Sequence, residues 1–188
     1  MLQFGVPSFS SPSIPRYKPR HAVFGLAIRG GNVACVAVKQ DSRCYFDLPG
    51  GGVRDRETEE DALIREFEEE VGLKVKPQLR LAEAGQFFSR SDGNSLVYNY
   101  GGFWIATVQG SATQSETNHR LCWLAAPAAI ASLRHESHAW LVLAWLRWPQ
   151  RAQGHYGRAD AEEIFRNRPY SKTRGAEKKK RASISAPM

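Results

Sequence analysis

The stretch GGVRDRETEEDALIREFEEEVGL, residues 51–73, begins in a glycine turn and continues as a segment dense in carboxylates. Thr58 is suited to cap the start of a helix, because its hydroxyl can accept a hydrogen bond from a backbone N–H of the first turn. Gly72 is suited to end that helix, because glycine adopts positive φ without a steric penalty. The stretch therefore predicts a loop followed by a helix from about Glu59 to Val71.

Two side-chain groups share this helix when it is drawn at roughly 100° per residue. The apolar group predicts the core-facing stripe and consists of Leu63, Ile64, Phe67 and Val71. Beside it, Glu66, Glu69 and Glu70 gather within an arc of about 100°. Like charges this close repel one another, and a hard, oxygen-liganded cation such as Mg²⁺ or Mn²⁺ removes the conflict. The alternative is a solvated acidic helix face, but the glycine turn and the spacing favour the metal site.

The spacing of the fixed residues resembles the Nudix box, G-x5-E-x7-R-E-U-x-E-E-x-G-U, where U is a bulky apolar residue. Gly51, Glu57 and the run from Arg65 to Leu73 match every fixed position. The surrounding pattern extends the resemblance over roughly Arg20 to Trp148. It implies an α/β fold, a Nudix-type α/β/α sandwich with a mixed β-sheet. It also implies a pyrophosphohydrolase that acts on phosphorus-containing acid anhydrides and uses Mg²⁺ or Mn²⁺.

The resemblance also assigns roles within the box. It places the metal on Glu69 and Glu70, with Glu66 as a further ligand or base, and it adds the backbone carbonyl of Gly50. Four residues then support the loop and helix: Gly51, Glu57, Arg65 and Gly72. Of these, Glu57 and Arg65 are expected to form an ion pair. Arg56 departs from the family, whose members often have glycine at this position, so it adds positive charge and stiffness to the loop.

Members of the family often supply one more carboxylate from a loop before the last strand. Glu116 is the only acid between Asp92 and Glu136, so it is the candidate for a fourth catalytic residue, as a base or a further ligand. The alternative is a solvated loop residue. His119 lies nearby in the sequence. His135 and His138, at the start of the last helix, are expected at the surface, and no substrate-binding residue is predicted.

The rest of the chain is predicted to form one α/β domain between two basic ends. Strands are expected at 22–28, 33–38, 45–48, 78–89, 95–108 and 120–124, and helices at 126–133 and 136–148. Residues 1–20 are expected to be extended or disordered, 21–149 to form the Nudix hydrolase domain, and 150–188 to form a basic, flexible tail. The net charge is +7. It resides at the ends, because 1–20 carry three basic residues and no acid, and 149–188 carry ten basic and four acidic residues.

The cysteines and the charged and apolar runs predict the location and the partners of the protein. Three isolated cysteines without a CxxC pair, no signal peptide and no apolar run of about 18 residues predict a cytoplasmic protein without membrane contact. The basic run Lys178–Arg181 suggests weak nucleic-acid contact, with a solvating tail as the alternative. The apolar stripe of the last helix is interpreted as core, with a homodimer interface as the alternative, and consists of Trp140, Leu141, Ala144, Trp145 and Trp148.

The predicted function is metal-dependent hydrolysis of a nucleoside diphosphate linked to a group X, with a nucleotide or nucleotide derivative as substrate. A nucleotide-sanitising enzyme is one subtype. A second hypothesis is removal of pyrophosphate from RNA 5′ ends, which the basic tail favours. The sequence Leu-Pro-Gly-Gly at Leu48–Gly51 disfavours it, because the RNA enzymes typically have Pro-Gln-Gly-Gly at this position. A third is a non-catalytic nucleotide-sensing module, which the complete set of box carboxylates disfavours.

Overall fold

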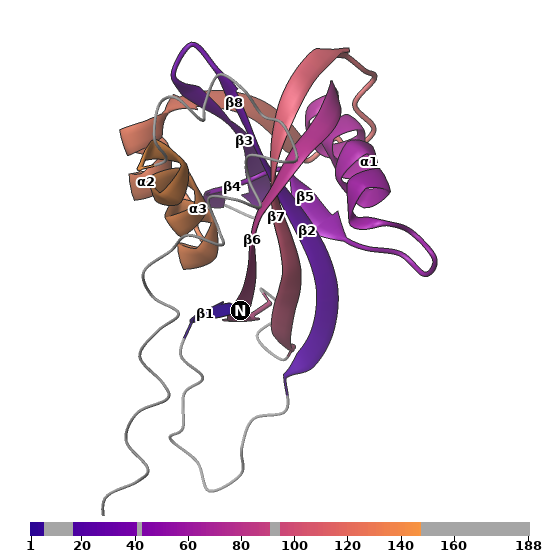
Figure 1. Cartoon of the computed structure of the whole chain (residues 1–188), viewed down its shortest axis with the longest axis vertical. Helices are drawn as coiled ribbons and strands as arrows, with labels where there is room; N and C mark the ends of the chain where they lie inside the picture. The colour runs from indigo at the N-terminus through magenta and orange to yellow at the C-terminus, as the bar shows by residue number, and fades with distance from the viewer. Residues whose placement is uncertain (6–16, 41–42, 91–94, 148–188) are drawn as a thin grey trace, which may run out of the picture.

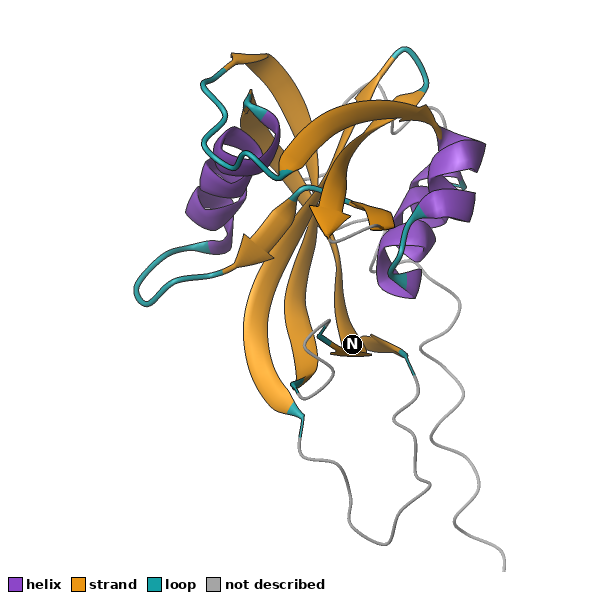
Figure 2. Ribbon diagram, turned by 180° about the vertical axis from the view of Figure 1, so that it is seen from behind, coloured by secondary structure: helices purple, strands orange, loops and turns teal. Residues whose placement is uncertain are grey.

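The computed structural model of the protein describes residues 1–5, 17–40, 43–90 and 95–147. In that part of the chain, a mixed sheet lies between helix α1 on one face and helices α2 and α3 on the other (Figures 1 and 2). The helices are α1 (Glu59–Val71), α2 (Ala126–Ser132) and α3 (Glu136–Leu146). The strands are β1 (Leu2–Phe4), β2 (Lys18–Arg29), β3 (Asn32–Gln40), β4 (Arg43–Asp47), β5 (Gly50–Gly52), β6 (Leu73–Ser89), β7 (Leu96–Ser111) and β8 (His119–Ala125). The predicted α/β/α sandwich with a mixed sheet is confirmed.

The sheet has the order β1-β6-β7-β2-β3-β4, with β5 paired to β2 and β8 paired to β3. β1 runs parallel to β6, and β2 runs parallel to β7. The other pairs are antiparallel, including the hairpin of β2 and β3, whose turn is Gly30–Gly31. The parallel pair β2–β7 brings residues about 80 positions apart into register, for example Arg20 beside Asn99.

Helix α1 has the predicted bounds, and both predicted caps are present. The Thr58 hydroxyl accepts a hydrogen bond from the Asp61 N–H at 3.1 Å, and Gly72 closes the helix with φ 63°. Leu63 and Phe67 are fully buried against the sheet, which contributes about 1.5–3 kcal/mol for each side chain. This packing fixes the rotation of the helix, so its acidic arc faces the loop that contains β5.

A second core lies between the sheet and the two C-terminal helices. Leu141 is fully buried there, and Trp140 and Trp145 pack against the same cluster, as the core interpretation of α3 predicts. Leu143 and Leu146 of α3 are exposed. The predicted helix extends to residue 148, which lies outside the described residues. The dimer interface stays a prediction.

Two strands were not predicted from the sequence. Gly50–Gly52 was expected to be a turn, since glycine has low β-propensity, but its pairing with β2 makes it β5. Leu2–Phe4 falls in the N-terminal segment that was expected to be extended or disordered. It is extended, and it pairs with β6 while the Gly5 N–H donates to Glu136 at 3.1 Å.

The domain boundaries predicted from the sequence stay predictions. β2 begins at Lys18, three residues before the predicted start of the domain. The predicted basic tail, including Lys178–Arg181, lies outside the described residues, as do residues 6–16 and 91–94. None of the described helices is long and apolar enough to cross a membrane.

Candidate active site

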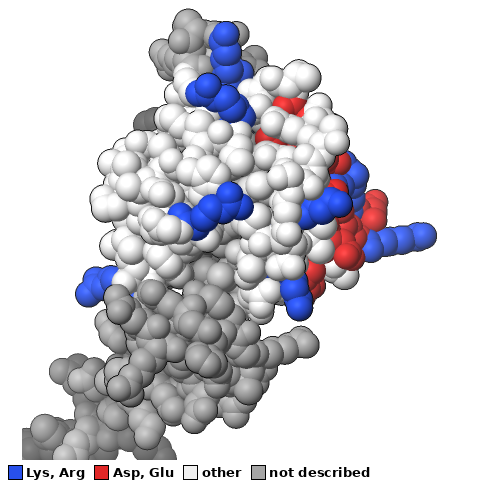
Figure 3. Space-filling view, turned by 90° about the horizontal axis from the view of Figure 1, so that it is seen from above, with Lys and Arg blue, Asp and Glu red and all other residues white. Residues whose placement is uncertain are grey.

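The acidic arc of α1 lines a cleft of about 530 Å³ whose other walls come from β2, β5, β7, the loop before β8 and the start of α3. Seen from above, acidic side chains gather on one side of the described surface, with Lys and Arg side chains beside them (Figure 3). All four predicted catalytic carboxylates line this cleft: Glu66, Glu69, Glu70 and Glu116. The structure therefore brings together residues that are up to 50 positions apart in the sequence.

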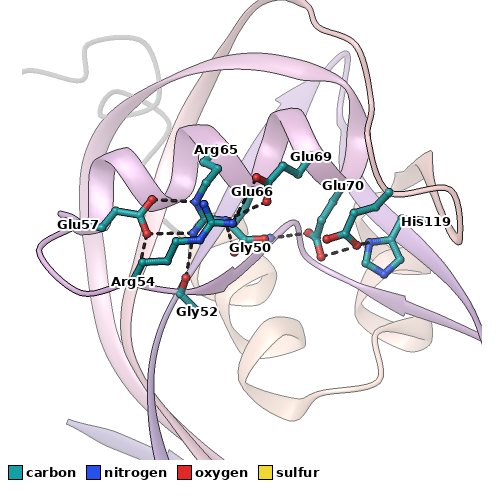
Figure 4. Close-up of polar contacts among 10 residues, drawn as sticks. Gly50, Gly52, Arg54, Glu57, Arg65, Glu66, Glu69, Glu70 and His119 are labelled. Atoms are coloured by element: carbon teal, nitrogen blue, oxygen red, sulfur yellow. Dashed lines mark hydrogen bonds and ion pairs between the residues drawn. The ribbon is translucent and has the colours of Figure 1, made fainter.

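Arg65 fastens the loop to the helix (Figure 4). Its Nε donates to Glu57 Oε1 at 2.8 Å, and its terminal nitrogen donates to Glu57 Oε2 and to the Gly52 carbonyl, both at 3.0 Å. The expected ion pair is thus present. The hydrogen bonds from Arg65 lower the pKa of Glu57 to about 2. Glu57 is therefore ionised and holds the loop to the helix through Arg65, which is the role that the resemblance implies.

The same guanidinium also reaches the acidic arc. Its other terminal nitrogen donates to Glu66 at 2.8 Å and to Glu69 at 3.0 Å (Figure 4). Arg54 approaches Glu69 from the loop at 3.5 Å. Arg65 therefore offsets part of the repulsion among the three glutamates that it binds, Glu57, Glu66 and Glu69. It also orients Glu66 and Glu69 in the cleft.

Glu70 lies deepest, and burial raises its pKa well above the ordinary value. Its Oε2 accepts a hydrogen bond from the Gly50 N–H at 2.9 Å. The pKa of Glu66 is also raised by burial. Two buried acids beside further carboxylates fit a divalent cation, because a positive charge stabilises the ionised form that burial disfavours.

Glu116 is held beside these acids by the end of α1. Its N–H donates to the Glu69 carbonyl at 3.0 Å, and the Ser115 N–H donates to the same oxygen at 3.2 Å. His119 Nδ1 lies 2.6 Å from Glu116 Oε2 and 3.4 Å from Glu70 Oε1. Two sets of three residues have potential ligand atoms that all lie within 4.8 Å of one another: Glu66, Glu69 and Glu116, and Glu70, Glu116 and His119.

The glycine loop permits these approaches. A Cβ on Gly51 would stand 2.5 Å from Glu66 Oε1, so a side chain at this position would displace the carboxylate from where Arg65 holds it. Gly50 has φ 147° and presents its N–H to Glu70, whereas the resemblance implies a metal-ligand role for its carbonyl. Arg56 adopts φ 65°. That left-handed conformation costs a non-glycine residue about 1–2 kcal/mol, so the departure from glycine leaves the loop strained.

The expectation that His135 and His138 lie at the surface was wrong, because both are buried. His138 Nδ1 accepts the Leu48 N–H at 3.2 Å, and its ring packs on Phe24 at 4.4 Å between centroids. Both histidines therefore belong to the wall of the cleft. Their separation by three residues at the start of an apolar helix, which places them on one helix face, was the signal available in the sequence.

This burial predicts a pH dependence of stability. Burial lowers the pKa of His138 well below the ordinary value, so the folded protein favours neutral imidazole. The resulting stabilisation is present above the unfolded pKa of about 6.5 and is lost as pH falls below it, by up to about 1.4 kcal/mol per pH unit. Urea unfolding of wild type and His138→Gln at pH 7.5, 6.5 and 5.5 measures this effect.

The informative quantity is the difference between the two proteins, because Glu66 and Glu70 act in the opposite direction. Their raised pKa values favour the protonated acids, so their contribution to stability increases as pH falls. We expect the free energy of unfolding of the glutamine variant to decrease less than that of wild type between pH 6.5 and 5.5. Parallel curves for the two proteins over that interval would show that His138 is charged in the fold.

Comparison with known proteins gives independent evidence on the family and the fold of this chain. A family model described as NUDIX domain matches residues 18–146. A search of curated proteins gave no match. Among solved structures, a NUDIX hydrolase from Nitrosomonas europaea has a TM-score of 0.58 at 15% identity, over 76% of this chain and 95% of that one. A MutT NUDIX hydrolase from Burkholderia pseudomallei has 0.51 at 21%, over 66% and 96%. An ADP-ribose pyrophosphatase from Streptococcus suis has 0.50 at 15%, over 69% and 93%.

Proposed function

The chain belongs to the NUDIX domain family, and we propose that it is a metal-dependent pyrophosphohydrolase that cleaves a nucleoside diphosphate linked to a group X. The observation that carries this proposal is that the three box carboxylates of the helix, Glu66, Glu69 and Glu70, line one cleft and that two of them are buried. A non-catalytic module has no need of buried acids, because ionised carboxylates in a protein interior lower stability unless a partner offsets their charge.

The described residues fit a divalent cation of the magnesium class. In this proposal Glu66, Glu69 and Glu70 contribute ligands. Glu116 belongs to both possible ligand sets, one with Glu66 and Glu69 and the other with Glu70 and His119. When bound, Mg²⁺ or Mn²⁺ supplies positive charge that offsets the phosphoryl oxygens and favours ionisation of a nearby water. The carboxylate ligands and the size of the ion make Mg²⁺ and Mn²⁺ better candidates than the soft metals, which prefer sulfur and nitrogen.

The chain's own residues account for the remaining tasks. Arg65 orients Glu66 and Glu69, and the Gly50 N–H orients Glu70. In this proposal Glu116 accepts the proton of the attacking water, which is supported by its position in the cleft and by His119 Nδ1 at 2.6 Å from its carboxylate. Water then forms a new bond to one phosphorus while the P–O bond of the anhydride breaks, and the leaving phosphate takes the electron pair.

A turnover assay tests the proposal. The full-length protein is incubated with Mg²⁺ and a panel of nucleoside triphosphates, ADP-ribose, dinucleotides and nucleotide sugars, and released monophosphate or phosphate is measured. We include ADP-ribose because one structural neighbour is a pyrophosphatase for it. We expect hydrolysis of at least one compound, lost with EDTA and restored by Mg²⁺ or Mn²⁺. Turnover that persists in EDTA, or no turnover of any compound, would contradict the proposal.

A second readout does not depend on the substrate. Mn²⁺ binding to the nucleotide-free protein is followed by the loss of the free-ion signal in electron paramagnetic resonance. We expect saturable binding that Mg²⁺ displaces. Absence of binding at millimolar Mn²⁺ would exclude the metal site independently of the choice of substrates.

A further inference from the structure

One part of the cleft is built on three adjacent strands, β2, β7 and β6. The sheet register places Arg20 of β2 beside Asn99 of β7, and Asn99 beside Gln86 of β6. Because alternate residues of a strand point to the same face, Phe88 lies on the same face as Gln86, and Arg90 follows directly after β6. Four of these residues line the cleft: Arg20, Phe88, Arg90 and Asn99.

This part of the cleft carries positive charge from two arginines. Neither Arg20 nor Arg90 forms an ion pair with another described residue. Arg20 is half-buried, and burial lowers its pKa, with Arg90 adding to the effect by repulsion. The attraction of Glu66 opposes this lowering of the pKa and outweighs the repulsion from Arg90, and Glu70 also attracts Arg20. Partly buried cations in proteins are normally paired, so the half-buried Arg20, with the exposed Arg90 beside it, suits an anionic ligand.

Arg134 adds a third guanidinium to the same part of the cleft. It is oriented by an ion pair with Asp47, and its Cζ lies 5.0 Å from the centre of the Tyr45 ring. Arg90 and Arg134 also border a second hollow of about 440 Å³, which shares Phe88 with the main cleft. The acid in that hollow, Glu136, already accepts the Gly5 N–H.

Asn99 provides an independent indication of a ligand. The residue is only 6% exposed, and its Oδ1 is buried without a hydrogen-bond partner among the described residues. A buried acceptor without a partner is costly, at about 1–3 kcal/mol. Asn99 stands beside Arg20 in the register. Its unpaired oxygen needs a donor, which a hydroxyl of the ribose that carries the phosphate can supply, whereas the phosphate oxygens bind the guanidinium groups.

We propose that this part of the cleft binds a phosphate group of the substrate in addition to its scissile diphosphate. Guanidinium groups bind phosphate through paired hydrogen bonds, and Arg90 and Arg134 stand at the border of the two hollows. Phe88 offers apolar surface for the ribose or base that carries the phosphate. The inference rests on the proposed function and narrows its substrate class to compounds with a second, separate phosphate.

A binding experiment tests the subsite without requiring turnover. Titration calorimetry with Mg²⁺ compares AMP with adenosine 2′,5′-bisphosphate and adenosine 3′,5′-bisphosphate, which each add one phosphate group. A third probe, the 5′-phosphorylated dinucleotide pApA, adds a phosphodiester together with a second adenosine, and ApA without the 5′-phosphate is its control. We expect at least one of the three probes to bind about 10-fold more tightly than AMP, because hydrogen bonds to charged groups are the strong ones. Preference for a bisphosphate indicates a ribose phosphate, and preference for pApA alone indicates a phosphodiester.

Arg90→Gln should abolish this preference, and Arg90→Lys should retain part of it. Arg90 is exposed, so neither change should disturb folding. Arg29→Gln is the matched control, because Arg29 stacks on Trp123 at 4.9 Å and does not line the cleft. Arg134→Gln gives a second test, with thermal unfolding measured alongside because it leaves Asp47 without its partner.

Two results would overturn the subsite: no added phosphate strengthens binding to wild type, or the preference survives in both Arg90→Gln and Arg134→Gln. These results are distinguishable from failure of the proposed function. A protein that discriminates among the probes but hydrolyses no anhydride contradicts the proposed function alone. A protein that hydrolyses anhydrides but binds all probes like AMP contradicts the subsite alone.

Discussion

Replacing Glu70 with glutamine is expected to lower kcat by about 10³-fold, because the site loses a ligand to an ion that supplies several kcal/mol of charge stabilisation. The fold should survive. Glutamine has nearly the same shape, and its amide oxygen can still accept the Gly50 N–H that now binds Glu70 at 2.9 Å. Burial raises the pKa of Glu70, so a neutral amide at this position removes a cost that the metal-free wild type carries at neutral pH.

Thermal unfolding separates this loss of function from a loss of structure. With EDTA, the melting temperature of Glu70→Gln should equal or exceed that of wild type. With Mg²⁺, wild type should gain stability by ligand linkage, and the variant should gain less. Glu60→Gln is the control, since Glu60 lies in the first turn of α1, is exposed and does not line the cleft. Unchanged kcat in Glu70→Gln at saturating Mg²⁺ would remove Glu70 from the metal site.

The box helix could be predicted closely because its information is local. Thr58, Gly72 and the apolar spacing within 13 residues specify where α1 begins, ends and packs. The burial of His135 and His138 could not be predicted in this way. For His138 it depends on contacts with Phe24 and with the backbone of Leu48, which lie far from α3 in the sequence.

The site shows the same division between local and long-range information. The ion pair of Glu57 with Arg65 follows from box spacing, and Glu116 was found as the only acid in its region. The part of the cleft that is built on β2, β7 and β6 was missed. It exists only because β2 pairs with β7, and β7 with β6, which sets Arg20 beside Asn99. No periodicity within one segment encodes a register between strands about 80 residues apart, so three arginines dispersed in the sequence gave no signal.

Glu116→Gln is expected to lower kcat by about 10- to 10⁴-fold, where the upper limit corresponds to a general base. The carboxylate already lies among the candidate ligands, and His119 Nδ1 is 2.6 Å away from it. Stability should change little, because the side chain is 39% exposed and the loop is attached through the Glu116 and Ser115 backbone N–H groups, which the substitution leaves in place. Steady-state kinetics on the best substrate, at saturating Mg²⁺, measures the effect.

The pH profile decides which role Glu116 has. A general base contributes the acidic limb of kcat against pH. If Glu116 accepts the proton, Glu116→Gln should remove that limb. If Glu116 is only a metal ligand, the substitution should leave the limb in place and raise the Mg²⁺ concentration required for activity. Ser115→Ala is the control, because it changes a neighbouring side chain and keeps the backbone contact to Glu69. Full kcat in Glu116→Gln would mean that the base lies within the box. Glu66 would then be the first candidate, since it is buried beside Gly51 and is oriented by Arg65 at 2.8 Å.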